Sequence, residues 1–395
     1  MEHDPQDLVA SVPAEPTYTL WALLRYMLKL GTVGFGGPVA LVGYMHRDLV
    51  LARHWITEAQ YKEGIALAQI APGPLATQLA IYLGYVHYRI RGATLAGLVF
   101  VLPSFLMVLA IGWAYVRFGG LPWMHAVFYG VGAAVIGIIA MSAKKLTERS
   151  IGRDRLLLVI YVLLASVTII TKTEIALLFL AAGVVVWLWR YPPGTGGPTS
   201  VAAVALLPLP AVLHTVASHK LVQIALFFTK AGAFVFGSGL AIVPFLYGGV
   251  VHGHQWLTDA QFVDAVAVAM ITPGPVVITV GFIGYLIAGV WGAVVAALGT
   301  FLPCYLFTIL LAPHMHQYGH RPAVRAFVDG VTAAAVGAIA GSVVILAERS
   351  IVDVPTAVIA VLTAGLLWKF KKLPEPVTIA SAAVFGLILF PLLHR

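Results

Sequence analysis

Apolar runs close to 20 residues long recur from Trp21 almost to the C-terminus. A run of about 20 apolar residues lets an α-helix cross the hydrocarbon core of a bilayer, where the helix satisfies its own backbone hydrogen bonds. Only 10% of the residues are charged, whereas soluble domains have about 25%. The sequence therefore predicts an all-α polytopic membrane protein and excludes a soluble enzyme.

The charged and sulfur-containing residues exclude several other classes of protein. Residues 1–17 contain acidic residues but neither Lys nor Arg, so they lack the basic start of a signal peptide and are expected to form a cytoplasmic tail. The one cysteine, Cys304, excludes an internal disulfide and a thiolate metal cage, and no metal or cofactor is expected. The net charge of +8 comes from cations scattered through short loops, as membrane topology requires, so no nucleic-acid partner is expected.

The two halves of the chain repeat each other at an offset of about 200 residues. The matching series include Lys29-Leu30-Gly31 with Lys230-Ala231-Gly232, Phe35-Gly36-Gly37 with Phe236-Gly237-Ser238, Ala71-Pro72-Gly73-Pro74 with Thr272-Pro273-Gly274-Pro275, and Glu148-Arg149-Ser150-Ile151 with Glu348-Arg349-Ser350-Ile351. We predict an N-terminal repeat over 18–193, a linker over 194–217 with an apolar stretch that crosses the membrane, and a C-terminal repeat over 218–395. Residues at equivalent positions of the two halves are called repeat-related below.

Each half contains six apolar segments, and the loop cations decide how the halves are oriented, because cytoplasmic loops are enriched in Lys and Arg. The segments are 20–45, 61–88, 92–116, 122–143, 154–171 and 174–190, then 220–250, 260–287, 290–312, 323–345, 354–368 and 374–393. Arg25, Lys29 and Lys230 lie inside segments and are left out of the count. Parallel halves then place 11 Lys and Arg residues on one side of the membrane and 10 on the other, whereas inverted halves place 13 on the cytoplasmic side and 8 outside. If the first two segments of each half are re-entrant hairpins, 16 of these cations lie on the cytoplasmic side and 5 outside. Inverted repeats are favoured, and crossing or re-entry stays open.

Both initial segments of the first half are interrupted, at Gly34-Phe35-Gly36-Gly37-Pro38 and at Pro72-Gly73-Pro74. Pro removes a backbone donor and Gly adds backbone freedom, so these are weak points of a helix. Broken helices at membrane depth occur where they are buried in protein or line a watery cavity. Inverted repeats with paired broken helices are typical of secondary transporters, whose site lies near the midplane. A helix that restarts after such a break presents free N–H groups, which suit an anion.

Ionisable residues inside the apolar segments are expected to have a functional or structural role, because placing each one in the membrane costs about 2.5–3.5 kcal/mol. Lys29 and its repeat mate Lys230 precede the first breaks, and Arg25 lies one turn before Lys29. They are candidates to neutralise an anion, although snorkelling to the interface would also explain them. Glu63 and Asp264, also repeat-related, are candidates for proton coupling or for counter-ions to the lysines, with a solvated helix end as the alternative.

The duplicated Gly-rich and Pro-Gly-Pro motifs resemble the signature of the chromate ion transporter family, in its long-chain, two-domain type. The resemblance covers about Leu20 to Leu393. It implies a multi-pass protein of a prokaryotic inner membrane that exports chromate and confers chromate resistance. The substrate-binding residues that it implies are Lys29, Phe35, Gly36, Gly37, Pro72, Gly73, Pro74, Lys230, Phe236, Gly237, Ser238, Pro273, Gly274 and Pro275.

Several alternatives remain at this point. Sulfate or another tetrahedral oxyanion would fit a site built from backbone N–H groups, which discriminate poorly between such ions. An anion channel could use the same helix ends. No nucleophile or cofactor motif supports a membrane-embedded enzyme. The expected partners are the oxyanion and the lipid bilayer, and a homodimer stays open.

Overall fold

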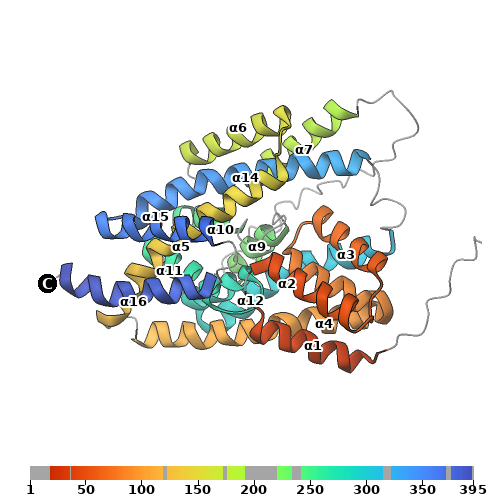
Figure 1. The fold of residues 1–395 in the computed structure, drawn as a ribbon, viewed down its shortest axis with the longest axis horizontal. Helices are drawn as coiled ribbons and strands as arrows, with labels where there is room; N and C mark the ends of the chain where they lie inside the picture. The colour runs from red at the N-terminus through yellow and green to blue at the C-terminus, as the bar shows by residue number, and fades with distance from the viewer. Residues whose placement is uncertain are drawn as a thin grey trace, which may run out of the picture.

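The computed structural model describes residues 18–35, 37–118, 122–171, 176–191, 220–233, 242–314, 322–370 and 375–393, and within them it is built from helices (Figure 1). The first half contains α1 (Leu20–Val33), α2 (Gly37–Met45), the π-helical turn η2 (His46–Ala52), α3 (Glu58–Ile70), α4 (Leu75–Phe118), α5 (Pro122–Ser150), α6 (Arg155–Thr171) and α7 (Ala176–Arg190). The second half contains α9 (Lys220–Ala233), α10 (Ile242–Tyr247), η4 (Gly248–Gly253), α11 (Asp259–Ile271), η5 (Val276–Ile278), α12 (Thr279–Leu311), η6 (Ala312–His314), α14 (Pro322–Ser350), α15 (Val354–Lys369) and α16 (Glu375–Leu393).

The first two segments of the N-terminal half are re-entrant hairpins. Tyr18, just before α1, stacks on Trp55, just after η2, with ring centroids 4.7 Å apart. The hairpin that turns at Pro72-Gly73-Pro74 returns to the same place, because the Tyr88 hydroxyl donates to the Tyr18 carbonyl. All the ends of both hairpins therefore lie on one side of the molecule, which we call the N-side.

A kink separates each hairpin from the membrane-crossing helix that follows it. Arg89 in α4 has a φ of 51° and Gly289 in α12 has a φ of 63°. Beyond these kinks α4 and α12 run antiparallel, since the Thr94 hydroxyl lies 2.6 Å from that of Tyr305. Among the residues that the structure describes, four helical stretches are long and apolar enough to cross a membrane: Leu75–Phe118, Ala126–Glu148, Val276–His314 and Pro322–Glu348.

The last two helices of each half are exchanged between the halves. In Figure 1, α6 and α7 lie along α14, and α15 and α16 lie along α5. Glycine permits this contact, because a Cβ on Gly130 would lie 2.0 Å from the Ala382 carbonyl oxygen. A Cβ on the repeat-related Gly330 would lie 2.5 Å from the Ala182 carbonyl oxygen. The core of this helical bundle is therefore built from both halves.

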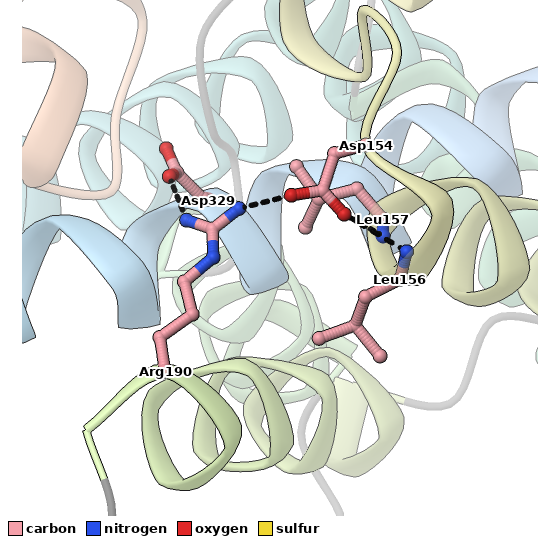
Figure 2. Close-up of polar contacts among 5 residues, drawn as sticks. All are labelled: Asp154, Leu156, Leu157, Arg190 and Asp329. Atoms are coloured by element: carbon pink, nitrogen blue, oxygen red, sulfur yellow. Dashed lines mark hydrogen bonds and ion pairs between the residues drawn. The ribbon is translucent and has the colours of Figure 1, made fainter.

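Contacts at the two ends of α5 and α14 show that these repeat-related helices are antiparallel. At one end Arg190 of α7 donates to Asp329, near the start of α14, and to Asp154, after the end of α5, each at 2.7 Å (Figure 2). We call this group the ionic clamp. At the other end Tyr129, near the start of α5, donates to Asp353, after the end of α14. The halves are thus inverted repeats.

The predicted segments agree with the observed helices in extent, but the breaks divide several of them. The segment 20–45 is divided into α1 and α2 at the Gly-rich break, 61–88 into α3 and the first part of α4, and 260–287 into α11, η5 and the first part of α12. The kinks at Arg89 and Gly289 lie at the predicted boundaries between 61–88 and 92–116 and between 260–287 and 290–312. The predicted tail and the predicted crossing stretch of the linker lie outside the described residues and stay predictions.

Candidate anion site at the helix breaks

The Gly-rich break of the first half meets the Pro-Gly-Pro loop of the second. The Gly274 N–H donates to the Gly34 carbonyl at 2.9 Å. The buried Ser104 hydroxyl of α4 lies 2.7 Å from the Pro273 carbonyl oxygen and 3.3 Å from that of Gly31. Gly274 has a φ of +96°, and a Cβ there would lie 2.0 Å from the Ser104 Oγ, so this junction requires glycine.

The Pro-Gly-Pro loop of the first half packs on the opposite half in the same way. Gly73 has a φ of +148°, and a Cβ on it would lie 2.9 Å from the Sγ of Cys304, the repeat mate of Ser104. Gln78, one turn into α4, folds back over the loop and donates from its Nε2 to the Ala71 and Pro72 carbonyls, at 3.2 and 3.0 Å. Each loop is therefore held between the two halves.

Helix N-termini follow these loops inside the protein. α4 begins at Leu75, directly after the first loop, and η5 and α12 follow Pro275. The N–H groups of a first helical turn have no partner within the helix, and the helix dipole places partial positive charge there. Two buried, positively polarised backbone ends on an inverted pair of loops can bind an oxyanion without any metal or cofactor.

The cationic candidates lie on the helices that precede the two Gly-rich breaks. Arg25 and Lys29 are exposed on the face of α1 opposite Gly31, and Lys230 is exposed on α9. Gly31 is where α1 packs on α4, since a Cβ there would lie 2.2 Å from the Phe100 carbonyl oxygen. Charged side chains are not stable against lipid tails, so these faces are suited to a water-filled approach to the breaks.

The remaining candidates are distributed around the loops. Phe35 is 38% exposed at the end of α1 and Gly37, with a φ of 72°, starts α2. Pro72 is half-buried, and Pro74 and Pro275 are buried at their loops. Gly36, Phe236, Gly237 and Ser238 lie outside the described residues.

The two carboxylate candidates have tyrosine partners. Asp264 of α11 accepts a hydrogen bond of 2.7 Å from Tyr115 of the opposite half, and Glu63 of α3 is paired with Tyr82 of α4. Asp264 lines a cavity of about 630 Å³ that also contains Asp259 and Tyr129. In the part of the chain that the structure describes, the ion pairs do not join either carboxylate to Lys29 or Lys230.

Sequence reasoning missed Ser104. It follows Pro103 as Cys304 follows Pro303, and this repeat relation is the only sequence signal that marks the position. The Thr-x-x-Gln spacing at Thr57 and at Thr258 predicts a capping box in each half, and the structure contains both, Thr57 with Gln60 at the start of α3 and Thr258 with Gln261 at the start of α11. Among the described residues, no cluster of three or more His, Cys, Asp or Glu side chains could hold a metal ion.

Comparison with known proteins identifies the relatives of this chain. A family model described as chromate transporter matches residues 21–187 and 222–387, one copy in each half. A chromate transport protein of Cupriavidus metallidurans is 68% identical over 99% of both chains. A probable chromate transport protein of Synechococcus elongatus is 58% identical over 94% of this chain and 96% of its own, and a chromate transport protein of Pseudomonas aeruginosa is 32% identical over 96% and 94%. No solved structure matches the chain.

Proposed function

Since the chain belongs to the chromate transporter family, whose named members are transport proteins and not enzymes, we propose that it exports chromate from the cytoplasm across a prokaryotic inner membrane and so confers chromate resistance. Chromate transport by a multi-pass membrane protein follows from the family and the apolar helices. The observation that carries the proposal is the 68% identity over the whole chain to a chromate transport protein, together with the meeting of the two helix breaks.

The proposed binding step uses the breaks. The oxyanion approaches along the exposed faces of α1 and α9, where Arg25, Lys29 and Lys230 attract it. It is then held by N–H groups of the helix ends that follow the Pro-Gly-Pro loops. Because the loops belong to one inverted pair, a rocking motion between the hairpins and the helical bundle exposes them alternately to the two sides.

The distribution of Lys and Arg between the two sides of the molecule supports export as the direction of transport. The N-side carries 16 of the 21 loop cations under the re-entrant topology, so we assign it to the cytoplasm. Export of an anion is then favoured by the inside-negative membrane potential, at about 2.3 kcal/mol per charge for each 100 mV. Asp264, in a cavity on the opposite side, and Glu63, in an N-side hairpin, are the proposed residues for coupling to protons.

Everted membrane vesicles test this function, because export becomes uptake. We expect vesicles containing the protein to accumulate chromate against its gradient, and a Lys230→Ala variant to accumulate it more slowly. Exposed Lys62, whose Nζ pairs at 3.5 Å with Glu58 outside the breaks, provides the control variant Lys62→Ala, which should behave as the wild type. Absence of uptake with intact protein in the membrane would refute chromate export, and Lys230→Ala uptake at the wild-type rate would refute the role of that lysine.

The same vesicles separate the proposal from its alternatives. Unlabelled chromate inside the vesicles should accelerate the uptake of labelled chromate, which is counterflow and requires alternating access. A channel would not show it. If sulfate accumulates and chromate does not, the protein is a sulfate transporter.

A further inference from the structure

The two Pro-Gly-Pro loops are followed by different side chains. In the second half the loop is fixed by Ser104 and by the Gly274 to Gly34 hydrogen bond, and the helix that follows carries Ile278 and Thr279. The Thr279 hydroxyl donates to the Val276 carbonyl at 2.8 Å. The side-chain polar groups named here all have partners, so they serve as a structural junction between the halves, and this loop offers an anion only the backbone N–H groups of the helix end that follows it.

In the first half the equivalent positions are Thr77 and Gln78, which are 1% and 0% exposed. The Gln78 Nε2 is used by the Ala71 and Pro72 carbonyls, which fixes the orientation of its amide. Within the described part of the chain, neither the Gln78 Oε1 nor the Thr77 Oγ1 has a hydrogen-bond partner. Buried polar atoms of proteins are almost always paired, so the unpaired Gln78 Oε1 at the start of α4 indicates a ligand.

The amide lies over the loop, because a Cβ on Gly73 would be 2.7 Å from the Gln78 Cδ. An anion held by the free N–H groups at the start of α4 would therefore have the Gln78 Oε1 beside it. That atom is an acceptor, and it cannot donate to an oxyanion. A bound oxyanion satisfies this buried acceptor directly if the ion carries a proton that it can donate to Oε1.

Tetrahedral oxyanions differ in this property. Chromate takes up a proton close to neutral pH and becomes hydrogen chromate, whereas sulfate takes up a proton only in strong acid. A site that hydrogen-bonds a substrate hydroxyl strongly rejects an analogue that lacks it, because the buried acceptor is then left unpaired. On the basis of the proposed function, we propose that Gln78 is a specificity-determining residue that accepts the proton of hydrogen chromate and so discriminates against sulfate.

The wild-type protein tests this proposal without any mutation. In everted vesicles, the KM for total chromate should rise about tenfold per pH unit above the pKa of hydrogen chromate, because only the protonated ion binds. At neutral pH, inorganic phosphate, which carries a hydroxyl, should compete at least tenfold better than sulfate. A KM that is constant over this pH range, or equal competition by sulfate and phosphate, overturns the proposal and leaves chromate transport standing. If the wild type transports no chromate at any pH, the proposed function has failed instead.

Two variants then assign the effect to the residue. Gln78→Met keeps the length of the side chain and removes its acceptor, together with the Nε2 hydrogen bonds to the Ala71 and Pro72 carbonyls. Loss of those two bonds can lower the rate of uptake, but loss of the acceptor is what should remove the pH dependence of the KM and let sulfate compete as well as phosphate. Thr279→Val, at the repeat-related position, should retain both properties of the wild type. If Gln78→Met folds and keeps the wild-type pH dependence and competition, Gln78 is not the acceptor. If it does not fold, the wild-type measurements still decide whether the bound ion is protonated.

Discussion

Removing the ionic clamp should weaken the contact between the two halves by a predictable amount. Arg190 lies 2.7 Å from both Asp154 and Asp329, and the three side chains are 29%, 36% and 35% exposed. Exposed ion pairs contribute about 0.2–1 kcal/mol, and interior hydrogen bonds to charged groups about 1.5–3 kcal/mol. For pairs that are about one-third exposed we take about 1 kcal/mol each, so Arg190→Gln should lower the free energy of unfolding by about 2 kcal/mol.

A double-mutant cycle measures the part of this energy that joins the halves. Unfolding in mixed detergent micelles is measured for Arg190→Gln, Asp329→Asn and the double variant, and we expect a coupling energy of about 1 kcal/mol. Lys62→Gln is the matched control, because its pair with Glu58 is 3.5 Å long, exposed and within the first half, and it should change stability by less than about 0.5 kcal/mol. A coupling energy indistinguishable from zero would refute the reasoning.

The clamp also predicts how stability depends on pH. Partial burial raises the pKa of Asp154, but the hydrogen bonds from the Leu157 N–H, Arg190 and the Leu156 N–H outweigh it and hold the pKa below the ordinary value of 3.8. A carboxyl whose pKa is lower in the folded state stabilises the fold above its unfolded pKa. We therefore expect this contribution to be complete above pH 3.8 and to disappear as the pH falls through the lower folded value. Arg190→Gln should reduce that acid-dependent loss.

Other parts of the molecule give further tests. Gly274→Ala should reduce the initial rate of chromate uptake at least tenfold, because its φ of +96° disfavours an L side chain and the added Cβ would lie 2.0 Å from the Ser104 Oγ; uptake at the wild-type rate would contradict this explanation. Arg53→Cys, with buried Cys304 as the only other thiol, should react with an impermeant maleimide in everted vesicles and not in right-side-out vesicles, and the reverse result would contradict the assigned orientation. With the external pH held constant, so that the fraction of hydrogen chromate offered to the transporter does not change, Asp264→Asn should reduce the response of chromate uptake to an imposed pH gradient, whereas an unchanged response would exclude Asp264 from coupling.

The sequence predicted the features that arise from short-range chemistry or from repetition. Capping boxes, interrupted helices and the inverted halves all follow from residue types at fixed spacing, and cation counts favoured the re-entrant form. The exchange of α6 and α7 onto α14 could not be predicted, because it depends on long-range contacts such as that of Gly330 with Ala182. Ser104 was not predicted for the same reason, because its partners Gly31 and Pro273 are distant from it in the chain.

The two halves differ in the contacts that they make at repeat-related positions, and these differences affect the two sides of the molecule unequally. Two identical inverted halves would make the states open to either side equal in free energy. Here the clamp pair Arg190 and Asp329 is replaced, at the repeat-related positions on the opposite side, by Phe390 and Tyr129, whose rings are 5.4 Å apart. The bundle is therefore held by ion pairs on the N-side, and on the opposite side by this aromatic contact together with the hydrogen bond from Tyr129 to Asp353. Because salt screens ion pairs that are partly exposed and leaves the ring contact unaffected, raising the ionic strength should weaken the N-side end of the bundle more than the opposite end.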